Sequence, residues 1–304
     1  MTSAAAMPTA AVAAAAALVL VIVGVTATSA ELFDLSYTFN ENAPTSPKFS
    51  AFRQELQRSG RNKLGIWVEV HSFCSSEHSG THINAPRHHY ETGWAVNDIP
   101  NARLWRVPGV VVDVSKRISQ SRNKNYEVTV RDLEAWEREH GVIPDRALVF
   151  IHTGWGKMVN NSGAYTGVDP LNNLNFPGVG KGAAEWLAKH GSDHGHDTGV
   201  VGVGIDTLSL DKGVSVRFPA QVKLFQSNIY GVENVANLDK LPESGFYVTV
   251  MPMKIGGGSG APARVIAEVD EGPGPNNASP TPSTLLLPPL LTATVATFYW
   301  FLEA

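Results

Sequence analysis

The segment that most restricts how this chain can fold spans residues 78–89 and reads His-Ser-Gly-Thr-His-Ile-Asn-Ala-Pro-Arg-His-His. Gly80 and Pro86 disfavour a long helix here, because glycine weakens a helix and proline removes a backbone donor. The preceding residues 66–73 alternate apolar and polar side chains, which is typical of a half-buried strand. We therefore expect a loop that leaves this strand and carries the histidines.

The histidines of this loop have the spacing of a metal site. His78 and His82 are four residues apart, and two neutral imidazoles on a tight loop can share one cation. His88 follows, and an imidazole there can act as a general base because it titrates near neutral pH. Asn84 is an amide at a position where a hard cation prefers a carboxylate. The alternative is that the three histidines are structural or lie on the surface.

The composition excludes some classes of protein. The chain has 304 residues, 43% of them hydrophobic, and a formal net charge of −4, which allows one large domain or two small ones. The pI is near 6.2 and no basic cluster is present, so nucleic acid is not an expected partner. Cys74 is the single cysteine, which excludes an intramolecular disulfide and a thiolate-rich zinc site. We expect it to be a buried, small apolar residue.

Both ends of the chain resemble processing signals. Residues 1–30 contain an Ala/Val/Leu run followed by small residues, which predicts a secretory signal peptide; a disordered Ala-rich extension is the alternative. Residues 272–284 form a Gly/Pro/Asn/Ser linker, and residues 285–304 form a hydrophobic tail. Together they predict a GPI-attachment signal at Asn276 or Asn277, with a transmembrane anchor or a plain secreted tail as alternatives. We expect a secreted protein held on the extracellular face of the plasma membrane by its C-terminal anchor.

The region between these ends is predicted to be one domain, because residues 31–271 contain no clear linker. Short apolar or β-branched runs predict further strands at residues 107–114, 147–153, 199–205, 246–251 and 264–269. One helix is expected after Thr129, where Asp132 completes a capping pattern and Gly141 stops the helix, and another over residues 183–190. Strands interleaved with helices indicate a mixed α/β domain.

The histidine segment resembles a family signature. Residues 78–88 are similar to the pattern H-x-G-T-H-x-D-x-P-x-H of the cyclase family, which includes bacterial kynurenine formamidases and isatin hydrolases. The resemblance covers nearly all of residues 33–268. It continues through the family's opening strand (33–36), its T-G-W segment (153–155), its G-I-D-T-x-S-x-D loop (204–211) and two late motifs (233–238 and 253–260).

The resemblance implies a swivelling β/β/α domain of the cyclase or kynurenine formamidase-like type, and a homo-oligomer. It also implies a divalent-metal hydrolase of linear or cyclic amides. Carried over by position, His78 and His82 match metal ligands. His88 matches the acid/base residue, and Glu233 matches a later glutamate ligand. Residues 44–47 contain no tryptophan, although the family has a substrate-contacting tryptophan there.

Two ligand positions depart from the family pattern. Asn84 stands where the family has an aspartate that bridges two metals, and Gln221 stands where it has a histidine. An amide offers a neutral oxygen and cannot compensate the charge of two cations. We therefore predict that no dinuclear centre forms and that at most one divalent metal, Zn or Mn, binds. Its ligands would be His78 and His82, with Glu233 or Asn84 completing the set.

These residues support two hypotheses of different classes. The first is a kynurenine formamidase-like amide hydrolase, in which a metal-bound hydroxide attacks an N-formylkynurenine-type or cyclic amide and His88 takes and returns a proton. The second is a catalytically impaired family member that serves as a binding or structural module on the cell surface, with a small-molecule ligand. Membership of the family does not choose between them.

Four other features have simpler explanations. Asp206 and Asp211 are expected to cap turns rather than bind metal. The Gly-rich residues 256–260 are expected to form a tight, close-packed turn, although their backbone N–H groups could cradle an anion. His194 and His196 are expected to lie in a solvated loop.

Overall fold

The structure is a computed structural model, and it describes residues 30–190 and 199–270. The predicted signal peptide, linker and C-terminal tail lie outside the described residues, as do His194 and His196, so these interpretations stay predictions. Within the described ranges, no helix is both long and apolar enough to cross a membrane.

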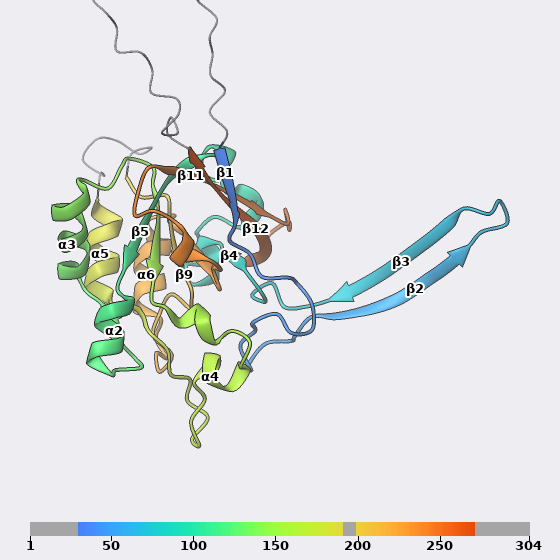
Figure 1. The fold of residues 1–304 in the computed structure, drawn as a ribbon, viewed down its shortest axis with the longest axis horizontal. Helices are drawn as coiled ribbons and strands as arrows, with labels where there is room; N and C mark the ends of the chain where they lie inside the picture. Colours follow the sequence, from blue (N-terminus) through green and yellow to red (C-terminus); the bar gives the residue numbers. More distant parts are fainter. Residues whose placement is uncertain (1–29, 191–198, 271–304) are drawn as a thin grey trace, which may run out of the picture. The chain divides into compact units, whose positions relative to one another are not determined.

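A strongly curved sheet forms the centre of the described region (Figure 1). Its strands are β1 (Ala30–Asp34), β4 (His82–Asn84), β5 (Val107–Asp113), β7 (Leu148–His152), β9 (Gly202–Ile205), β10 (Tyr230–Glu233), β11 (Phe246–Pro252) and β12 (Gly260–Asp270). They are ordered β1-β12-β11-β5-β7-β9-β10-β4. The start of β12 also pairs with β4, so the sheet closes on itself like a barrel. Strands β5, β7, β9 and β10 run parallel, and their neighbours pair antiparallel.

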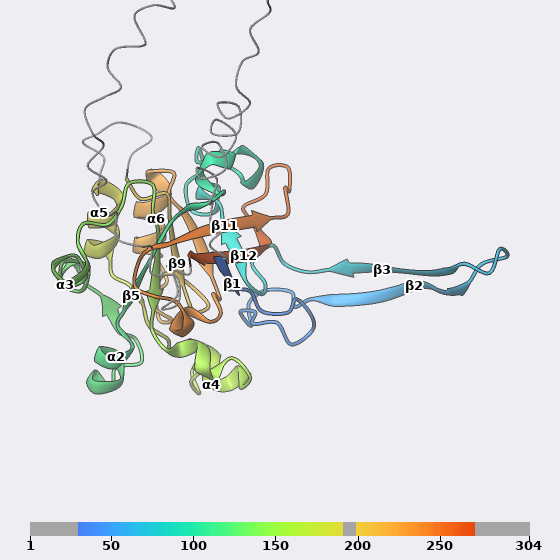
Figure 2. The same cartoon turned by 45° about the horizontal axis from the view of Figure 1, so that its top comes forward.

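The central strands are apolar on both faces because both faces are covered. On β7, Val149 and Ile151 face the core beneath the helices, whereas Leu148 and Phe150 face the barrel interior. The described helices are α2 (Ser115–Ser121), α3 (Val130–His140), α4 (Ser162–Thr166), α5 (Lys181–Lys189) and α6 (Pro219–Gln226). Helices α3, α5 and α6 cover the outer face of the parallel strands (Figure 2).

The predicted mixed α/β domain is confirmed, and so are its main elements. Helix α3 begins after Thr129, whose backbone N–H donates to the Asp132 carboxylate at 2.8 Å, and it ends at Gly141, where φ is 91°. Strands β5, β7, β9, β11 and β12 coincide with the predicted runs to within a few residues. Sequence reasoning did not locate the short strands β4 and β10.

One predicted strand has a different environment from the one expected. Strands β2 (Arg53–Arg61) and β3 (Trp67–Cys74) form a hairpin that extends away from the barrel (Figure 1). The prediction of a half-buried strand at residues 66–73 was wrong, because both faces of the hairpin are largely exposed. The prediction of a buried Cys74 was wrong for the same reason. Two further short strands, β6 (Glu127–Val128) and β8 (Gly178–Val179), pair with each other beside the helices.

The exposed apolar side chains of this hairpin predict self-association. Leu56 pairs with His71, so Leu56 and Trp67 share a face, and they are 56% and 57% exposed. An isolated two-stranded hairpin is only marginally stable in water. We expect the native chain to show a mass above that of a monomer by light scattering coupled to size-exclusion chromatography. The double substitution Leu56→Ser and Trp67→Ser should lower that mass, whereas Glu55→Ala on the same hairpin should not. A monomeric native chain would contradict this expectation.

Candidate functional site

The site forms where the short strand β4 closes the barrel. The register places His82 opposite Glu233 of β10, and Asn84 opposite both Gly231 of β10 and Gly260 of β12. All three residues of β4 are buried. Backbone pairing on both sides therefore fixes the direction in which the β4 side chains point.

The loop before β4 is held by the end of β10. Gly80 has a φ of 64°, and a Cβ on it would lie 2.8 Å from the ring of Phe39, so glycine is required on both conformational and steric grounds. The Gly80 carbonyl accepts a hydrogen bond from the Asn234 side chain at 2.8 Å. The Thr81 hydroxyl donates to the Asn234 carbonyl at 2.7 Å. The histidines thus sit on a rigid loop.

His82 and Glu233 lie together in the buried centre of the site. His82 Nδ1 is 2.9 Å from the Gly80 carbonyl, and because a carbonyl only accepts, Nδ1 must be the donor. His82 Nε2 lies 3.2 Å from Glu233 Oε2, but within the described residues it has no hydrogen-bond partner of acceptable geometry. Glu233 Oε1 accepts from the backbone N–H of Leu210 at 2.7 Å. Burial alone would raise the pKa of Glu233, but the neighbouring His82 outweighs it and the pKa is lowered.

His78 lies beside this pair and contacts polar groups through both ring nitrogens. Nδ1 is 2.6 Å from Asn84 Oδ1, and Nε2 is 3.0 Å from Ser259 Oγ. Burial, followed by the proximity of His82, lowers the pKa of His78 to about 4. His78 is therefore neutral around pH 7, which is the state in which an imidazole can bind a metal.

Gln221 reaches the same site from the first turn of α6. The Asp211 carboxylate accepts the backbone N–H groups of Ala220 and Gln221 at 3.0 and 3.1 Å, so it caps the start of this helix, whereas the sequence predicted the cap of a turn. Gln221 Nε2 donates to Ser209 Oγ at 2.9 Å. Gln221 Oε1 is buried and has no partner in the part of the chain that the structure describes. Asp206 does not cap a turn of its own loop in this contact, because it accepts the backbone N–H of Thr153, from the segment that follows β7, at 3.0 Å.

His88 follows β4 in a short 3-10 turn, Pro86–His88, and its ring lies next to two others, tilted against both. Its centroid lies 4.0 Å from that of His78 and 4.1 Å from that of His89. Burial, followed by the proximity of His78, lowers the pKa of His88 to about 2. His88 is therefore neutral around pH 7, but its lowered pKa makes it a weaker base than the imidazole titrating near neutral pH that the sequence predicted. His89, which the sequence reasoning did not single out, stacks on Phe218 at 4.6 Å.

These side chains line one end of a cavity of about 370 Å³. This cavity is lined by His78, His88, Gln221 and Glu233, whereas Asn84 is not part of its wall. The remaining wall contains Phe49, Leu174, Phe176, Leu208 and Phe218, together with Lys48 and Lys212. The cavity has the size and the largely apolar character of a small-molecule site.

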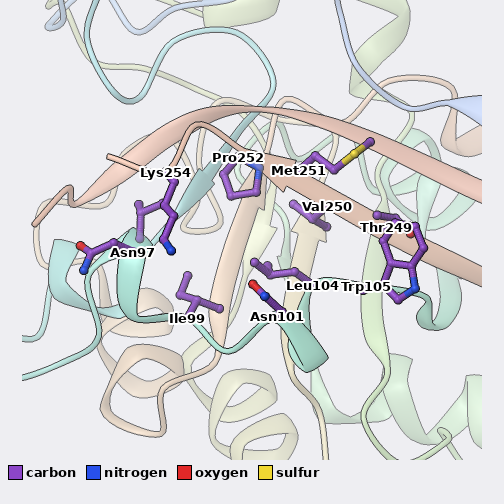
Figure 3. Close-up of a pocket in the computed structure, with 11 residues that line it drawn as sticks. Asn97, Ile99, Asn101, Leu104, Trp105, Thr249, Val250, Met251, Pro252 and Lys254 are labelled. Carbon is purple, nitrogen blue, oxygen red and sulfur yellow. The ribbon is translucent and has the colours of Figure 1, made fainter. Parts of the chain in front are cut away.

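Another cavity, of about 420 Å³, has a wall made of other residues (Figure 3). Its wall combines apolar side chains such as Leu104, Trp105 and Met251 with Asn101 and Lys254. It contains no histidine or carboxylate, so the smaller cavity is the better candidate for chemistry.

The donor atoms of the site fit one cation better than two. Within the described ranges, no three or more His, Cys, Asp and Glu side chains are grouped closely enough to hold a metal ion by themselves. An amide adds a donor: Gln221 Oε1 is buried and, like the ring nitrogen His82 Nε2, has no hydrogen-bond partner among the described residues. Together with the Glu233 carboxylate they offer nitrogen and oxygen donors of the kind that zinc and manganese accept.

A closed sheet with buried imidazole and carboxylate groups beside the closing strand β4 agrees with the family that the histidine segment indicated. The family model named Cyclase matches residues 33–212, which is more than half of the chain. The chain therefore belongs to the cyclase family, as its histidine segment indicated.

Individual relatives agree with this assignment. The chain is 32% identical over 255 residues to an isatin hydrolase of Roseibium aggregatum, which covers 81% of this chain and 89% of that protein. It is 23% identical over 238 residues to a kynurenine formamidase of Bacillus cereus, covering 78% and 97% of the two chains. The solved structure of isatin hydrolase A from Labrenzia aggregata bound to benzyl benzoate superimposes with a TM-score of 0.70 at 30% identity. That alignment covers 84% of this chain and 100% of the other. The relatives place the chain among the cyclase-family hydrolases.

Close packing around His78 gives a prediction for the Gly-rich turn. A Cβ on Gly260 would lie 2.5 Å from His78 Cε1, whereas a Cβ on Gly256 would meet nothing within 4 Å. Gly260→Ala should therefore displace His78 and lower the free energy of unfolding by about 1–3 kcal/mol. Gly256→Ala should change it by no more than about 0.5 kcal/mol. Denaturant unfolding of both variants tests this, and equal effects would refute the packing argument.

Proposed function

We propose that this protein is a single-metal amide hydrolase that opens or cleaves small aromatic amides. The proposal is carried by the approach of His82 Nε2 to Glu233 Oε2 at 3.2 Å, at a cavity whose wall contains both Glu233 and Gln221. Gln221 Oε1 is buried there and has no hydrogen-bond partner among the described residues. Two imidazoles, a carboxylate and an amide oxygen would hold one divalent cation, with His78 as the second imidazole. Such a cation would supply polarisation of the amide carbonyl.

The cavity wall favours an aromatic substrate of the cyclic amide type. Phe49, Phe176 and Phe218 line the cavity and can bury an aromatic ring. Lys48 and Lys212 also line it and can attract the carboxylate that forms when a cyclic amide is opened. The similarity to isatin hydrolases supports this substrate class more than an N-formyl amide.

The reaction adds one water across the amide bond. A C–O bond forms at the carbonyl carbon, the C–N bond breaks, and the proton of the water moves to the leaving nitrogen. His88 is the residue placed to carry that proton, because its ring lines the cavity beside His78. In a cyclic amide both products stay in one molecule, which then carries a carboxylate and an aromatic amine.

The hydrolase proposal predicts metal-dependent turnover. The purified protein should bind about one Zn²⁺ or Mn²⁺ per chain and should open isatin faster than it hydrolyses N-formylkynurenine. His82→Ala should abolish both metal binding and turnover, because it removes a buried ligand. His71→Ala removes an exposed histidine of the hairpin and should change neither. Metal analysis by mass spectrometry and an absorbance assay measure the two effects. Absence of turnover with excess of either metal would leave the non-catalytic alternative.

That alternative, a cyclase-family protein that binds a small molecule without hydrolysing it, is favoured by one specific observation. Asn84 and Gln221 are neutral, so Glu233 is the single carboxylate among the residues at the matched ligand positions. A second cation there would lack charge compensation.

Restoring the family's ligands at positions 84 and 221 should therefore restore a second metal site. Asn84→Asp combined with Gln221→His should raise the number of bound divalent metals per chain above that of the native protein, measured by mass spectrometry after dialysis. Asn123→Asp combined with Gln57→His, at exposed positions outside the site, serves as a control for the added charge and imidazole. If the first double variant binds no more metal than the native protein, the positional match is wrong.

A further inference from the structure

A chain of hydrogen bonds connects the Gly-rich turn to the histidines. Glu77 Oε2 accepts the backbone N–H groups of Ser259 at 2.9 Å and of Gly260 at 3.2 Å. It also accepts the Ser259 hydroxyl at 2.8 Å. The turn at residues 256–260 therefore does cradle an anion, and this anion is a carboxylate of the chain itself.

The direction of each hydrogen bond in this chain follows from counting protons. A carboxylate accepts and does not donate, and a serine hydroxyl has one proton. The Ser259 proton is therefore directed at Glu77. Ser259 Oγ is then left as an acceptor for the group 3.0 Å away, which is His78 Nε2. His78 must supply the proton of that bond from Nε2.

This proton count fixes the other nitrogen of His78. A neutral imidazole carries one ring proton, so a proton on Nε2 leaves a free lone pair on Nδ1. Nδ1 lies 2.6 Å from the side-chain amide of Asn84. Two acceptors at that distance require either a cation that both bind or an amide turned so that its NH₂ faces the ring, and the amide orientation is an assignment. In both cases the Nδ1 lone pair points into the buried site.

The tautomer of His82 is also fixed by a hydrogen bond, but here the proton is on Nδ1. Its Nδ1 donates to the Gly80 carbonyl, so a neutral His82 presents Nε2 toward Glu233. A metal-binding histidine commonly donates its other N–H to a carbonyl or carboxylate, which fixes both tautomer and orientation. Groups outside the site thus fix the tautomer of both histidines. A backbone carbonyl does so for His82, and Glu77 acts through Ser259 on His78.

We propose that Glu77 and Ser259 are positioning residues that hold His78 as its Nε2–H tautomer and direct Nδ1 at a divalent cation. The inference rests on the single-metal site of the proposed function. It assigns a role to two residues that lie outside the matched ligand positions, and that touch neither the cation nor the substrate.

The variants Glu77→Gln and Ser259→Ala test this role. An amide at position 77 can donate to Ser259 Oγ, which frees the serine proton for His78 Nε2 and moves the ring proton to Nδ1. Removal of the hydroxyl leaves Nε2 without its partner. Both variants should bind Zn²⁺ about 10- to 100-fold more weakly than the native chain, measured by competition with a chelating dye. Glu134→Gln, an exposed position on α3, should bind like the native chain.

A second readout separates this inference from the hydrolase proposal. Nitrogen-15 NMR of histidine-labelled, metal-free protein distinguishes the two tautomers, with the His78 signals assigned from a His78→Gln variant. We expect the proton on Nε2 in the native chain and a shift toward Nδ1 in Glu77→Gln. If the native chain binds neither Zn²⁺ nor Mn²⁺, the proposed function fails while the tautomer result still decides the role of Glu77.

Other results would overturn the inference. These are a proton on Nδ1 of His78 in the native chain, or native Zn²⁺ affinity in both variants when circular dichroism shows that they are folded. If Glu77→Gln does not fold, Ser259→Ala carries the test, because it removes one hydroxyl and leaves the backbone donors of the turn in place.

Discussion

The pairing of β4 with both β10 and β12 is the constraint on which the rest of the structure depends. This three-residue strand closes the sheet, and the same pairing brings His82 to Glu233. If β4 shifted by one residue, the histidine would face the opposite side of the sheet. Closure of the barrel and assembly of the site are therefore one structural event.

The charge of the site depends on the groups that surround Glu233 where β4 closes the sheet. A buried carboxylate is costly unless it has a partner, and Glu233 has the Leu210 backbone N–H on one oxygen and His82 beside the other. Neutral amides at positions 84 and 221 add donors without adding charge. The single carboxylate of the matched ligand positions is the physical reason for proposing one divalent cation rather than two.

Local patterns predicted local structure well. The capping pattern of Thr129 and Asp132 located α3, and the uninterrupted apolar runs located β5 and β7. The alternating pattern of residues 66–73 was misleading, because an exposed hairpin can carry the same alternation as a half-buried strand. Sequence alone had no signal for the absence of a covering layer, and the expected environment of Cys74 was wrong for that reason.

The site was predictable as a set of histidines and an altered ligand pair, but its connections were not. Glu77 is adjacent to the signature, yet Ser259 and Gly260, which bind its carboxylate, come from the far end of the domain and meet it where β12 starts. The separate features of the sequence, a glutamate, a Gly-rich turn and a histidine, become one chain of hydrogen bonds when the barrel closes.

The two histidines also differ in how strongly the fold controls them. The carbonyl that orients His82 belongs to the loop of the signature itself, so it persists wherever that loop folds. The groups that orient His78 are side chains, Ser259 and Glu77, which a substitution can remove without unfolding the loop. The proposed role of Glu77 therefore depends on three contacts at once, with the Ser259 hydroxyl and with the backbone N–H groups of Ser259 and Gly260.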